Sequence, residues 1–387
     1  MTGSVLESDT QTKPPQFGPE IRHQPELDGI RGIAILSVLL THTANVAKFD
    51  VYPHTIAGWP IRAVLGPGWA GVDLFFVLSG FLITGILLRT KRADNYLSSF
   101  YMRRILRIAP IYYLTIGLFF LVSRLSAQIR AIVPPIAPYL FYLQNWPIFL
   151  PQPPLELNIF GHFWSLAIEE QFYLVWPFVL LFLSETAMLW LCVIGFAAAI
   201  PLRLFLGYLY GFDFGHLMML TSSRMDGLFV GAAISVFTWK YKRPVPMFWI
   251  IGAAVCGAAV FLAIVLRNPK ELMYTGARMH TVGVSAVALM GGALVAASQH
   301  RNKKLTRVLN LSFLRTFGKY AYGLYVYHVA IYWIALRLTG GIPRPFPIAL
   351  ALLYSVSLVA VAFLVAKVSY EYIEAPILRM KRIFQSH

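Results

Sequence analysis

The chain has 387 residues, of which 58% are hydrophobic and 13% charged, and its mean hydropathy is +0.63. A soluble domain carries about 25% charged residues, whereas the apolar residues here form blocks of about twenty, the length that spans a bilayer. This composition excludes an ordinary soluble protein and predicts an all-α, polytopic integral membrane protein. The net charge of +16 lies largely in short loops between apolar blocks. There it sets orientation and contacts anionic lipid headgroups, so we expect no nucleic acid partner.

Ten apolar segments are predicted to be transmembrane helices. They lie at residues 30–48, 69–89, 109–125, 163–184, 187–209, 222–239, 247–266, 280–298, 318–337 and 347–369. The segment 138–150 is too short and too rich in proline to span, so we predict a re-entrant or interfacial segment. Residues 1–24 are predicted to be a disordered cytoplasmic tail, 25–380 a single transmembrane domain, and 381–387 a cytoplasmic C-terminal tail.

Basic residues cluster in four places, each directly after a predicted span. The clusters lie at 89–107, 240–243, 301–307 and 379–382. The positive-inside rule places such loops in the cytoplasm. With a cytoplasmic N-terminus, ten spans put all four clusters inside, so both termini are predicted to be cytoplasmic.

The stretch LDGIRGIAILSVLLTH, residues 27–42, leads into the first span and contains one arginine and one histidine. Arg31 and His42 are eleven residues apart, or three helical turns plus about 20°, so they share a helix face. A rise of about 1.5 Å per residue separates them by roughly 16 Å along the axis. A snorkelling arginine and a packed histidine would explain both residues. Ionisable groups at membrane depth are costly, however, and they mark functional sites.

The next two stretches carry an aspartate and an arginine cluster. In GVDLFFVLSGF, Asp73 lies at the outer end of the second span, among glycines that favour close helix packing. The sequence YMRRILRIAP contains Arg103, Arg104 and Arg107, and Pro110 is predicted to open the third span. The cluster fits a positive-inside anchor. It also fits a clamp for phosphate groups, which arginine binds through two N–H groups at once.

The stretch HFWSLAIEEQFY, residues 162–173, combines a histidine with two adjacent acids. Its candidate side chains are His162, Trp164, Ser165, Glu169 and Glu170. His162 and Glu169 are seven residues apart, about 20° short of two helical turns, which predicts a shared face. Trp164 is predicted to lie at the membrane interface. A carboxylate in such a span needs a cationic partner or its neutral form, so a structural ion pair is the alternative to chemistry.

Later spans add further candidates near their ends. They are Arg224 and Asp226 in SRMDGLFVGA, Tyr325 and His328 in YAYGLYVYHVA, and Glu374 in YEYIEAP. Arg224 and Asp226 are two residues apart and cannot face each other, so each is predicted to pair with another helix. Pro376 is predicted to break the last helix.

Motifs of several common enzyme classes are absent from the sequence. It contains no GxSxG, HExxH or Walker A motif. Cys192 and Cys256 both lie inside apolar segments, so neither a disulfide framework nor a metal site is expected. What remains is a histidine with distributed arginines and carboxylates in a membrane domain. That set favours general-base activation of a hydroxyl over redox or metal chemistry.

Together these pieces resemble the bacterial membrane-bound acyltransferase-3 family. RGIAILSVLLTH is similar to the family's opening Arg-x10-His motif, formed here by Arg31 and His42. GVDLFFVLSGF, RRILRIAP, HFWSLAIEEQFY, SRMDGLFVG, AYGLYVYH and the terminal EAP resemble its other blocks, in the same order, over about residues 25 to 380. The resemblance implies ten spans in the bacterial cytoplasmic membrane. It also implies transfer of an acyl group, commonly acetyl, from cytosolic acyl-CoA to a carbohydrate or glycolipid acceptor such as surface polysaccharide, lipopolysaccharide or peptidoglycan.

The resemblance also implies roles for individual residues. His42 would be the catalytic histidine, acting as a general base on the acceptor hydroxyl, and Glu169 the carboxylate in the core. The residues implied to hold the phosphates of the donor acyl-CoA are Arg31, Arg103, Arg104 and Arg107. A covalent acyl-enzyme on tyrosine or histidine is the alternative mechanism, and no metal is expected. The rival functions are a transporter or flippase of a glycolipid or small anion, which would favour matching broken spans in two halves, and a scaffold without chemistry.

Overall fold

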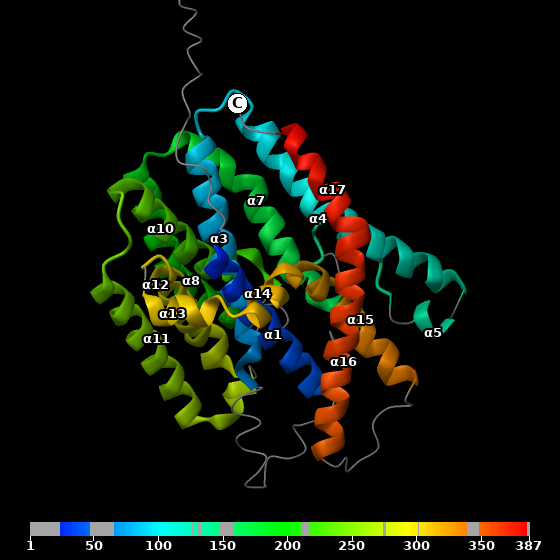
Figure 1. Cartoon of the computed structure of the whole chain (residues 1–387). Helices are drawn as coiled ribbons and strands as arrows, with labels where there is room; N and C mark the ends of the chain where they lie inside the picture. Colours follow the sequence, from blue (N-terminus) through cyan, green and yellow to red (C-terminus); the bar gives the residue numbers. More distant parts are fainter. Residues whose placement is uncertain are drawn as a thin grey trace, which may run out of the picture.

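The computed structural model describes the chain at residues 24–46, 66–125, 127–130, 133–146, 158–210, 217, 219–273, 276–300, 302–338 and 348–384. These residues form helices and no strand, which confirms the all-α fold (Figure 1). The predicted tails fall largely outside these ranges, which omit residues 1–23 and 385–387. In chain order the helices, with 3-10 and π turns labelled η, are α1 Pro25–Val46, η2 Gly66–Trp69, α3 Ala70–Thr90, α4 Tyr96–Leu125, α5 Ala127–Arg130, α6 Ala137–Leu140, η5 Gly161–Phe163, α7 Trp164–Phe182, α8 Glu185–Tyr210, η6 Thr221–Ser223, α10 Met225–Tyr241, α11 Met247–Arg267, η7 Pro269–Met273, η8 Met279–Gly283, α12 Val284–Ser298, α13 Lys303–Leu309, α14 Ser312–Lys319, α15 Ala321–Leu338, α16 Ile348–Ser369, η9 Tyr370–Glu374, α17 Ala375–Arg379 and η10 Met380–Phe384.

Helix α3 lies inside the bundle, and α10 packs along it with the two backbones in contact. A Cβ added to Gly80 of α3 would lie 2.0 Å from the carbonyl oxygen of Leu228 in α10. A Cβ on Gly231 of α10 would lie 1.9 Å from the carbonyl oxygen of Val77 in α3. Only glycine permits this approach, so the two glycines fix the crossing, as the glycines of the second span predict.

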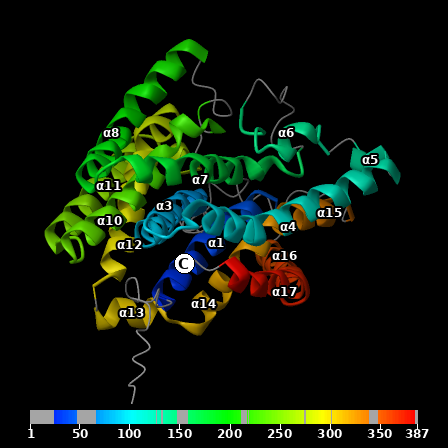
Figure 2. The ribbon, with the colours of Figure 1, turned by 90° about the horizontal axis from the view of Figure 1, so that it is seen from above.

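Helix α1 runs between α3 and the short helix α14, as the two views at right angles show (Figures 1 and 2). A Cβ on Gly318 of α14 would lie 1.9 Å from the carbonyl oxygen of Asp28 in α1. The N-terminal half of α1 is therefore held in place by backbone contact with α14. This rigid packing matters because α1 carries both Arg31 and His42.

Burial separates inner helices from outer ones. In the most apolar stretch of each helix, 61% of the residues of α3 and of η8–α12 are buried, against 17% for α8 and for α11. Large apolar side chains are exposed along α4, α8, α11 and α16, for example Leu121, Trp190, Leu266 and Val356. A soluble protein rarely exposes so much continuous apolar surface, so these helices face lipid.

Seven described helical stretches are long and apolar enough to cross a membrane. They are Gly66–Thr90, Tyr96–Leu125, Gly161–Phe182, Glu185–Leu209, Met247–Arg267, Met279–Ser298 and Ala349–Phe384. The other three predicted spans also form helices, α1, α10 and α15, with 22, 17 and 18 residues. These three carry ionisable side chains of the core. A multi-pass helical membrane protein is therefore confirmed, while the total of ten stays a prediction.

Two prolines lie within continuous helical stretches, although Pro110 was predicted to open the third span and Pro376 to break the last helix. Pro110 lies inside α4, so the arginine cluster and the third span form one continuous helix of 30 residues. Proline removes a single main-chain hydrogen bond, and membrane helices tolerate it where neighbouring groups supply partners. Pro376 does not break the last helix either, because α16 continues through the π turn η9 into α17. Pro376 lies in the first turn of α17, the position that proline disturbs least.

The predicted re-entrant segment is described only at residues 138–146, and 147–150 lie outside the described residues. The described part contains only α6 and turns, so this part does not span the membrane as a helix. Gln144 is buried, and its Nε2 donates to the carbonyl oxygen of Phe163 at 2.9 Å. Protein groups thus satisfy this donor of the irregular segment, as a membrane setting requires, whereas the buried Gln144 Oε1 accepts no hydrogen bond from a described residue.

Cysteine labelling tests the predicted orientation. The loop between α3 and α4 lies at the same end of the bundle as α17, and α11 ends at the opposite end (Figure 1). Ser98 in the first turn of α4 and Lys270 after α11 are both exposed. Each is replaced by cysteine in a chain whose Cys192 and Cys256 are serine. If the termini are cytoplasmic, an impermeant maleimide labels Lys270→Cys in intact cells and Ser98→Cys only after permeabilisation. The reverse pattern would overturn the orientation.

Candidate active site

A cavity of about 350 Å³ lies among α1, α3, α4, α7, α14, α15 and η10. Its charged lining residues are Arg31, Arg103, Arg104, Arg107, Lys381 and Glu169. Segments from both ends of the chain meet here, and five cations face one carboxylate. The four arginines that the sequence groups together do line one cavity. Such an excess of positive charge suits an anionic ligand.

Ring and ion-pair contacts orient two of these arginines. Arg104 lies over the rings of Phe100 and Tyr173, with its guanidinium carbon 5.8 and 5.6 Å from the ring centroids. Such cation–π contacts hold the guanidinium in place without neutralising its charge. Arg31 NH1 lies 2.6 Å from Asp28 Oδ1, one turn earlier in α1. This pair fixes the cation at the cytoplasmic end predicted for α1.

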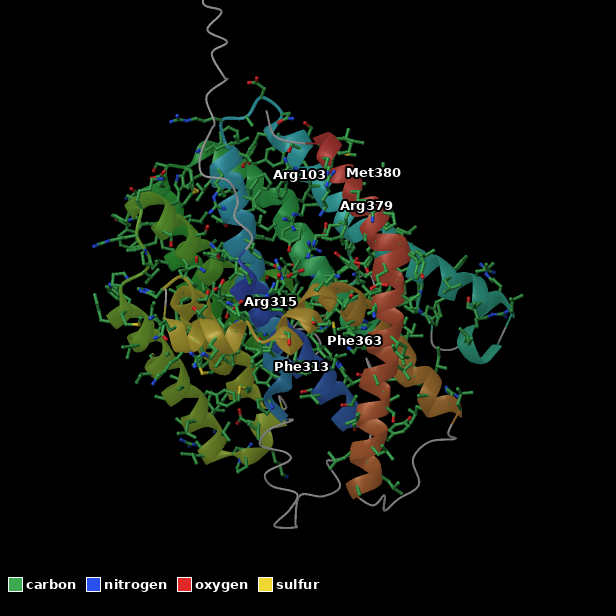
Figure 3. The ribbon with its side chains drawn as sticks, viewed as in Figure 1. Arg103, Phe313, Arg315, Phe363, Arg379 and Met380 are labelled. Carbon is green, nitrogen blue, oxygen red and sulfur yellow. The ribbon has the colours of Figure 1, made fainter. Side chains whose placement is uncertain are left out.

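The C-terminal turn η10 forms one wall of the cavity. The carbonyl oxygen of Phe384 accepts hydrogen bonds from Arg103 Nε at 2.7 Å and Ser99 Oγ at 3.0 Å. Figure 3 shows Arg103 on α4 beside the end of α17, where Met380 lies. These bonds bring Lys381 to the cavity wall. Sequence reasoning missed Lys381 because, in the sequence, it is only one of several basic residues that set orientation.

Of the two adjacent acids on α7, only Glu169 lines the cavity. The Ser79 hydroxyl of α3 donates to Glu169 Oε1, and the Tyr173 hydroxyl donates to Ser79 Oγ at 3.0 Å. Adjacent helical residues point about 100° apart, so Glu170 is directed elsewhere. Glu170 Oε1 is buried and accepts no hydrogen bond from the described residues. The Ser79 contact therefore selects Glu169 as the carboxylate of the site.

Two hydroxyl groups in the cavity lining, those of Ser165 and Tyr325, lie toward its end away from Arg31. The main-chain oxygen of Tyr325 accepts from His328, whose ring contacts His42, and His42 lies about three turns of α1 from Arg31. The Tyr325 hydroxyl donates to the carbonyl oxygen of His162 at 2.8 Å. Its single proton is then used, so the Ser165 hydroxyl, 2.5 Å away, donates to the tyrosine oxygen.

Three histidines meet directly behind these hydroxyls: His42 of α1, His162 of η5 and His328 of α15. The ring centroids of His42 and His328 are 4.9 Å apart, and so are those of His162 and His328. None of the three lines the cavity, and Tyr325 connects them to it. The main-chain oxygen of Tyr325 accepts from His162 Nε2 at 2.9 Å and from His328 Nδ1 at 2.8 Å. Sequence reasoning named all three histidines but gave no sign that they touch.

The helical periodicity of α7 does not reach back to His162. His162 lies in the 3-10 turn η5, and α7 begins only at Trp164. His162 joins the histidine cluster while Glu169 lines the cavity, so the predicted shared face is not formed. Trp164, predicted at the membrane interface, is half-buried, with its ring 6.2 Å from that of Phe76 and 5.5 Å from the guanidinium carbon of Arg224.

Two buried ion pairs account for three further candidates. Arg224 NH2 lies 2.9 Å from Asp73 Oδ1, and Arg203 NH1 lies 2.9 Å from Asp226 Oδ2, with all four side chains at most 1% exposed. Arg224 and Asp226 therefore pair with α3 and α8, as their spacing predicts. Neither pair lines the cavity. Arg203 was missed because a single arginine inside an apolar helix belongs to no motif.

Glu374 lies outside the cavity, in the π turn η9, and its side chain is buried. It packs against α15, where a Cβ on Gly323 would lie 3.1 Å from Glu374 Oε1. Next to that glycine, Tyr322 lines the cavity and donates its hydroxyl to the carbonyl oxygen of Ile108 at 2.6 Å. Glu374 thus belongs to the packing of the C-terminal helix on α15.

The chain belongs to the acyltransferase-3 family, because a family model described as an acyltransferase domain matches residues 24–367. It is 29% identical to the peptidoglycan O-acetyltransferase OatA of Listeria monocytogenes and 26% identical to the O-acetyltransferase OatA of Staphylococcus aureus, each over 92% of this chain. The chain spans only 56% and 57% of the lengths of these relatives. No solved structure matches the chain. The predicted family and the predicted enzyme class, an acyltransferase, are confirmed, and the transporter alternative gains no support.

The buried pair of Asp73 and Arg224 should act on stability. Removing one partner of a buried pair leaves an uncompensated charge, at a cost of about 3–5 kcal/mol, whereas replacing both partners by apolar residues of similar size is far milder. We expect Asp73→Leu to lower the melting temperature of the detergent-solubilised protein and Asp73→Leu with Arg224→Met to recover most of the loss. An unchanged melting temperature in Asp73→Leu would contradict a structural role for the pair.

Proposed function

We propose that this acyltransferase moves an acyl group, acetyl as the first choice, from cytosolic acyl-CoA to a hydroxyl group of a carbohydrate acceptor. The cavity carries the proposal: five cationic side chains surround one end, and the hydroxyls of Ser165 and Tyr325 lie at the other, against the histidine cluster. The names of the two relatives, both O-acetyltransferases, support acetyl as the group and oxygen as its acceptor atom.

The donor fits the polarity of the cavity. CoA carries its phosphates on the nucleotide, followed by a pantetheine arm that ends in the thioester. Arginine binds phosphate through two N–H groups, so the cationic end suits the nucleotide. Apolar residues such as Leu82, Ile83 and Leu166 line the cavity beyond it and suit the arm. A volume of about 350 Å³ is at the small end for ligand pockets, so we place the arm inside and the nucleotide at the mouth.

The acceptor should approach from the other side of the histidine cluster. His42 does not line the donor cavity, and Tyr325 separates the two. Donor and acceptor would then reach the centre from opposite ends of the bundle, as transfer across a membrane requires. Peptidoglycan is the first acceptor to test, because one relative is named for it. We place the protein in the bacterial cytoplasmic membrane with both termini cytoplasmic, so that the cationic end of the cavity faces the cytosolic pool of acyl-CoA.

His42 is the general base in this proposal. Its imidazole accepts the proton of the acceptor hydroxyl while the oxygen attacks the carbonyl carbon of the thioester. The new C–O bond forms, the C–S bond breaks, and the CoA thiolate leaves and takes up one proton while the His42 imidazolium releases the one that it accepted, which restores the neutral base. Glu169, held by Ser79 on the cavity wall, helps to orient the donor.

Two substitutions test the donor site. Arg107→Ala and Lys381→Ala each remove a cation from the cavity, and losing one charge-assisted contact costs roughly 1.5–3 kcal/mol, or about ten- to a hundredfold in affinity. We therefore expect each variant to bind CoA about ten- to a hundredfold more weakly in calorimetry on nanodisc-embedded protein. Arg124→Ala is the matched control, because Arg124 lies on the same helix over the Phe120 ring and outside the cavity. CoA affinity that stays at the wild-type value in both cavity variants would contradict the donor assignment.

A conservative substitution tests the base. Glutamine keeps the volume and hydrogen bonding of histidine but cannot accept a proton at neutral pH. Positioned general bases contribute about 10²- to 10⁴-fold, so we expect His42→Gln to lose at least about 99% of acetyl transfer from labelled acetyl-CoA to peptidoglycan fragments while binding CoA normally. His300→Gln, at a histidine outside the cavity, is the control. More than about a tenth of wild-type turnover in His42→Gln would rule out this role, given that range.

A further inference from the structure

We propose that His328 is a positioning residue that fixes the ring tautomer of His42 and so leaves Nε2 as the nitrogen that accepts the proton. This inference rests on the proposed role of His42 as the general base, and it assigns a partner to that base. The two rings touch, since His328 Nε2 lies 3.2 Å from His42 Nδ1. The tautomers follow from the other atoms around each ring, because a carbonyl oxygen can only accept a hydrogen bond.

The groups around the His328 ring determine where its hydrogen lies. Its Nδ1 lies 2.8 Å from the carbonyl oxygen of Tyr325 and 3.1 Å from that of Leu324. Both neighbours are acceptors, so Nδ1 must carry the hydrogen. The ring is fully buried, and no described carboxylate pairs with it. A buried charge without a counter-ion is very costly, so the ring is neutral and its Nε2 has a free lone pair.

The tautomer of His328 in turn determines the tautomer of His42. His42 Nδ1 faces the lone pair of His328 Nε2 at 3.2 Å and the carbonyl oxygen of Val38 at 3.1 Å. Both contacts are acceptors, so His42 Nδ1 carries the hydrogen and shares it between them. His42 Nε2 is then unprotonated. Without these two acceptors either nitrogen could hold the proton, and part of the enzyme would present an N–H group to a hydroxyl that it must deprotonate.

The same arrangement assists the reaction once the proton has moved. His42 becomes an imidazolium when Nε2 accepts the acceptor's proton. Its Nδ1–H still points at the His328 lone pair and the Val38 oxygen, and hydrogen bonds from an ionised donor are about twice as strong as neutral ones. A serine-protease triad uses a carboxylate to orient its histidine. Here a neutral imidazole does so, which avoids a buried negative charge beside the base.

His162 has a different place in the cluster. Its Nε2 donates a hydrogen bond to the Tyr325 main-chain oxygen, which also accepts one from His328 Nδ1. Its ring meets that of His328 nearly edge-on, with an interplanar angle of 70°. Tyr332 also packs edge-on against His328, with its hydroxyl making no hydrogen bond to any described residue. The geometry therefore singles out His328 as the neighbour whose ring nitrogen reaches His42.

Two substitutions separate the hydrogen bond from packing. In His328→Gln the amide oxygen can accept from His42 Nδ1–H while the NH₂ group donates to the Tyr325 oxygen, and His328→Leu can do neither. Loss of the correct tautomer costs about 10⁴-fold when the partner is a carboxylate. Because Val38 remains as an acceptor, we expect at least about a tenfold loss of kcat in His328→Leu, with KM for acetyl-CoA unchanged. The kcat of His328→Gln should stay within about threefold of the wild-type value, and so should the kcat of Tyr332→Phe.

Two independent measurements accompany the kinetics of the His328 variants. Wild type and His42→Gln are assayed in parallel, so a failure of the proposed function shows itself there. Nitrogen chemical shifts of ¹⁵N-histidine protein, with His42 assigned by its disappearance in His42→Gln, report the tautomer without any turnover. We expect Nδ1–H in wild type and a mixture of tautomers in His328→Leu. If the leucine variant unfolds, judged by its melting temperature, His328→Met replaces it. An Nε2–H tautomer of His42 in wild type, or wild-type kcat in a folded apolar variant, would overturn the inference.

Discussion

A polar side chain buried in a membrane bundle has to find its partner within the protein, and this constraint arranges the interior of the molecule. The ion pairs that join α3 to Arg224, directly before α10, and α8 to Asp226 in α10 are buried, and each links separate segments. Breaking one would leave a charge that neither water nor lipid can solvate. These pairs and the glycine contacts along α3 together fix how the inner helices cross. The active-site region is assembled on that fixed frame.

The cavity lining carries more positive than negative charge, although Arg31 pairs with Asp28 and Arg103 donates to the carbonyl oxygen of Phe384. Five cations surround it, and Glu169 is the one carboxylate in its lining. Like charges held close together repel, so the arrangement raises the energy of the empty protein. A ligand with several phosphates would remove that repulsion, because each phosphate supplies negative charge and acceptor oxygens at once. The excess of positive charge in the cavity lining is thus a physical reason for the proposed polyanionic donor, independent of any sequence motif.

Local patterns in the sequence predicted what depends on neighbouring residues. Hydropathy gave the all-α membrane fold, and the spacing of Arg31 and His42 placed them on one helix. Contacts between distant segments could not be predicted in this way. The bond from Arg103 to Phe384 and the meeting of His42 with His328 join residues more than 250 positions apart. The 3-10 turn that removes His162 from the face of Glu169 was also hidden, because one turn of helix leaves no periodic pattern.

Helix α1 links the two halves of the site. It carries Arg31 in the donor cavity and His42 in the histidine cluster, and eleven residues of rigid helix hold them roughly 16 Å apart. Backbone contact with α14 prevents the N-terminal end of α1 from shifting. In the proposed function, a donor whose phosphates are bound near Arg31 extends its arm through the cavity toward Tyr325, which lies between the cavity and His42. The fixed distance along α1 then favours a long, flexible donor over a compact one such as an acyl phosphate, whose phosphate and acyl carbon are only a few bonds apart.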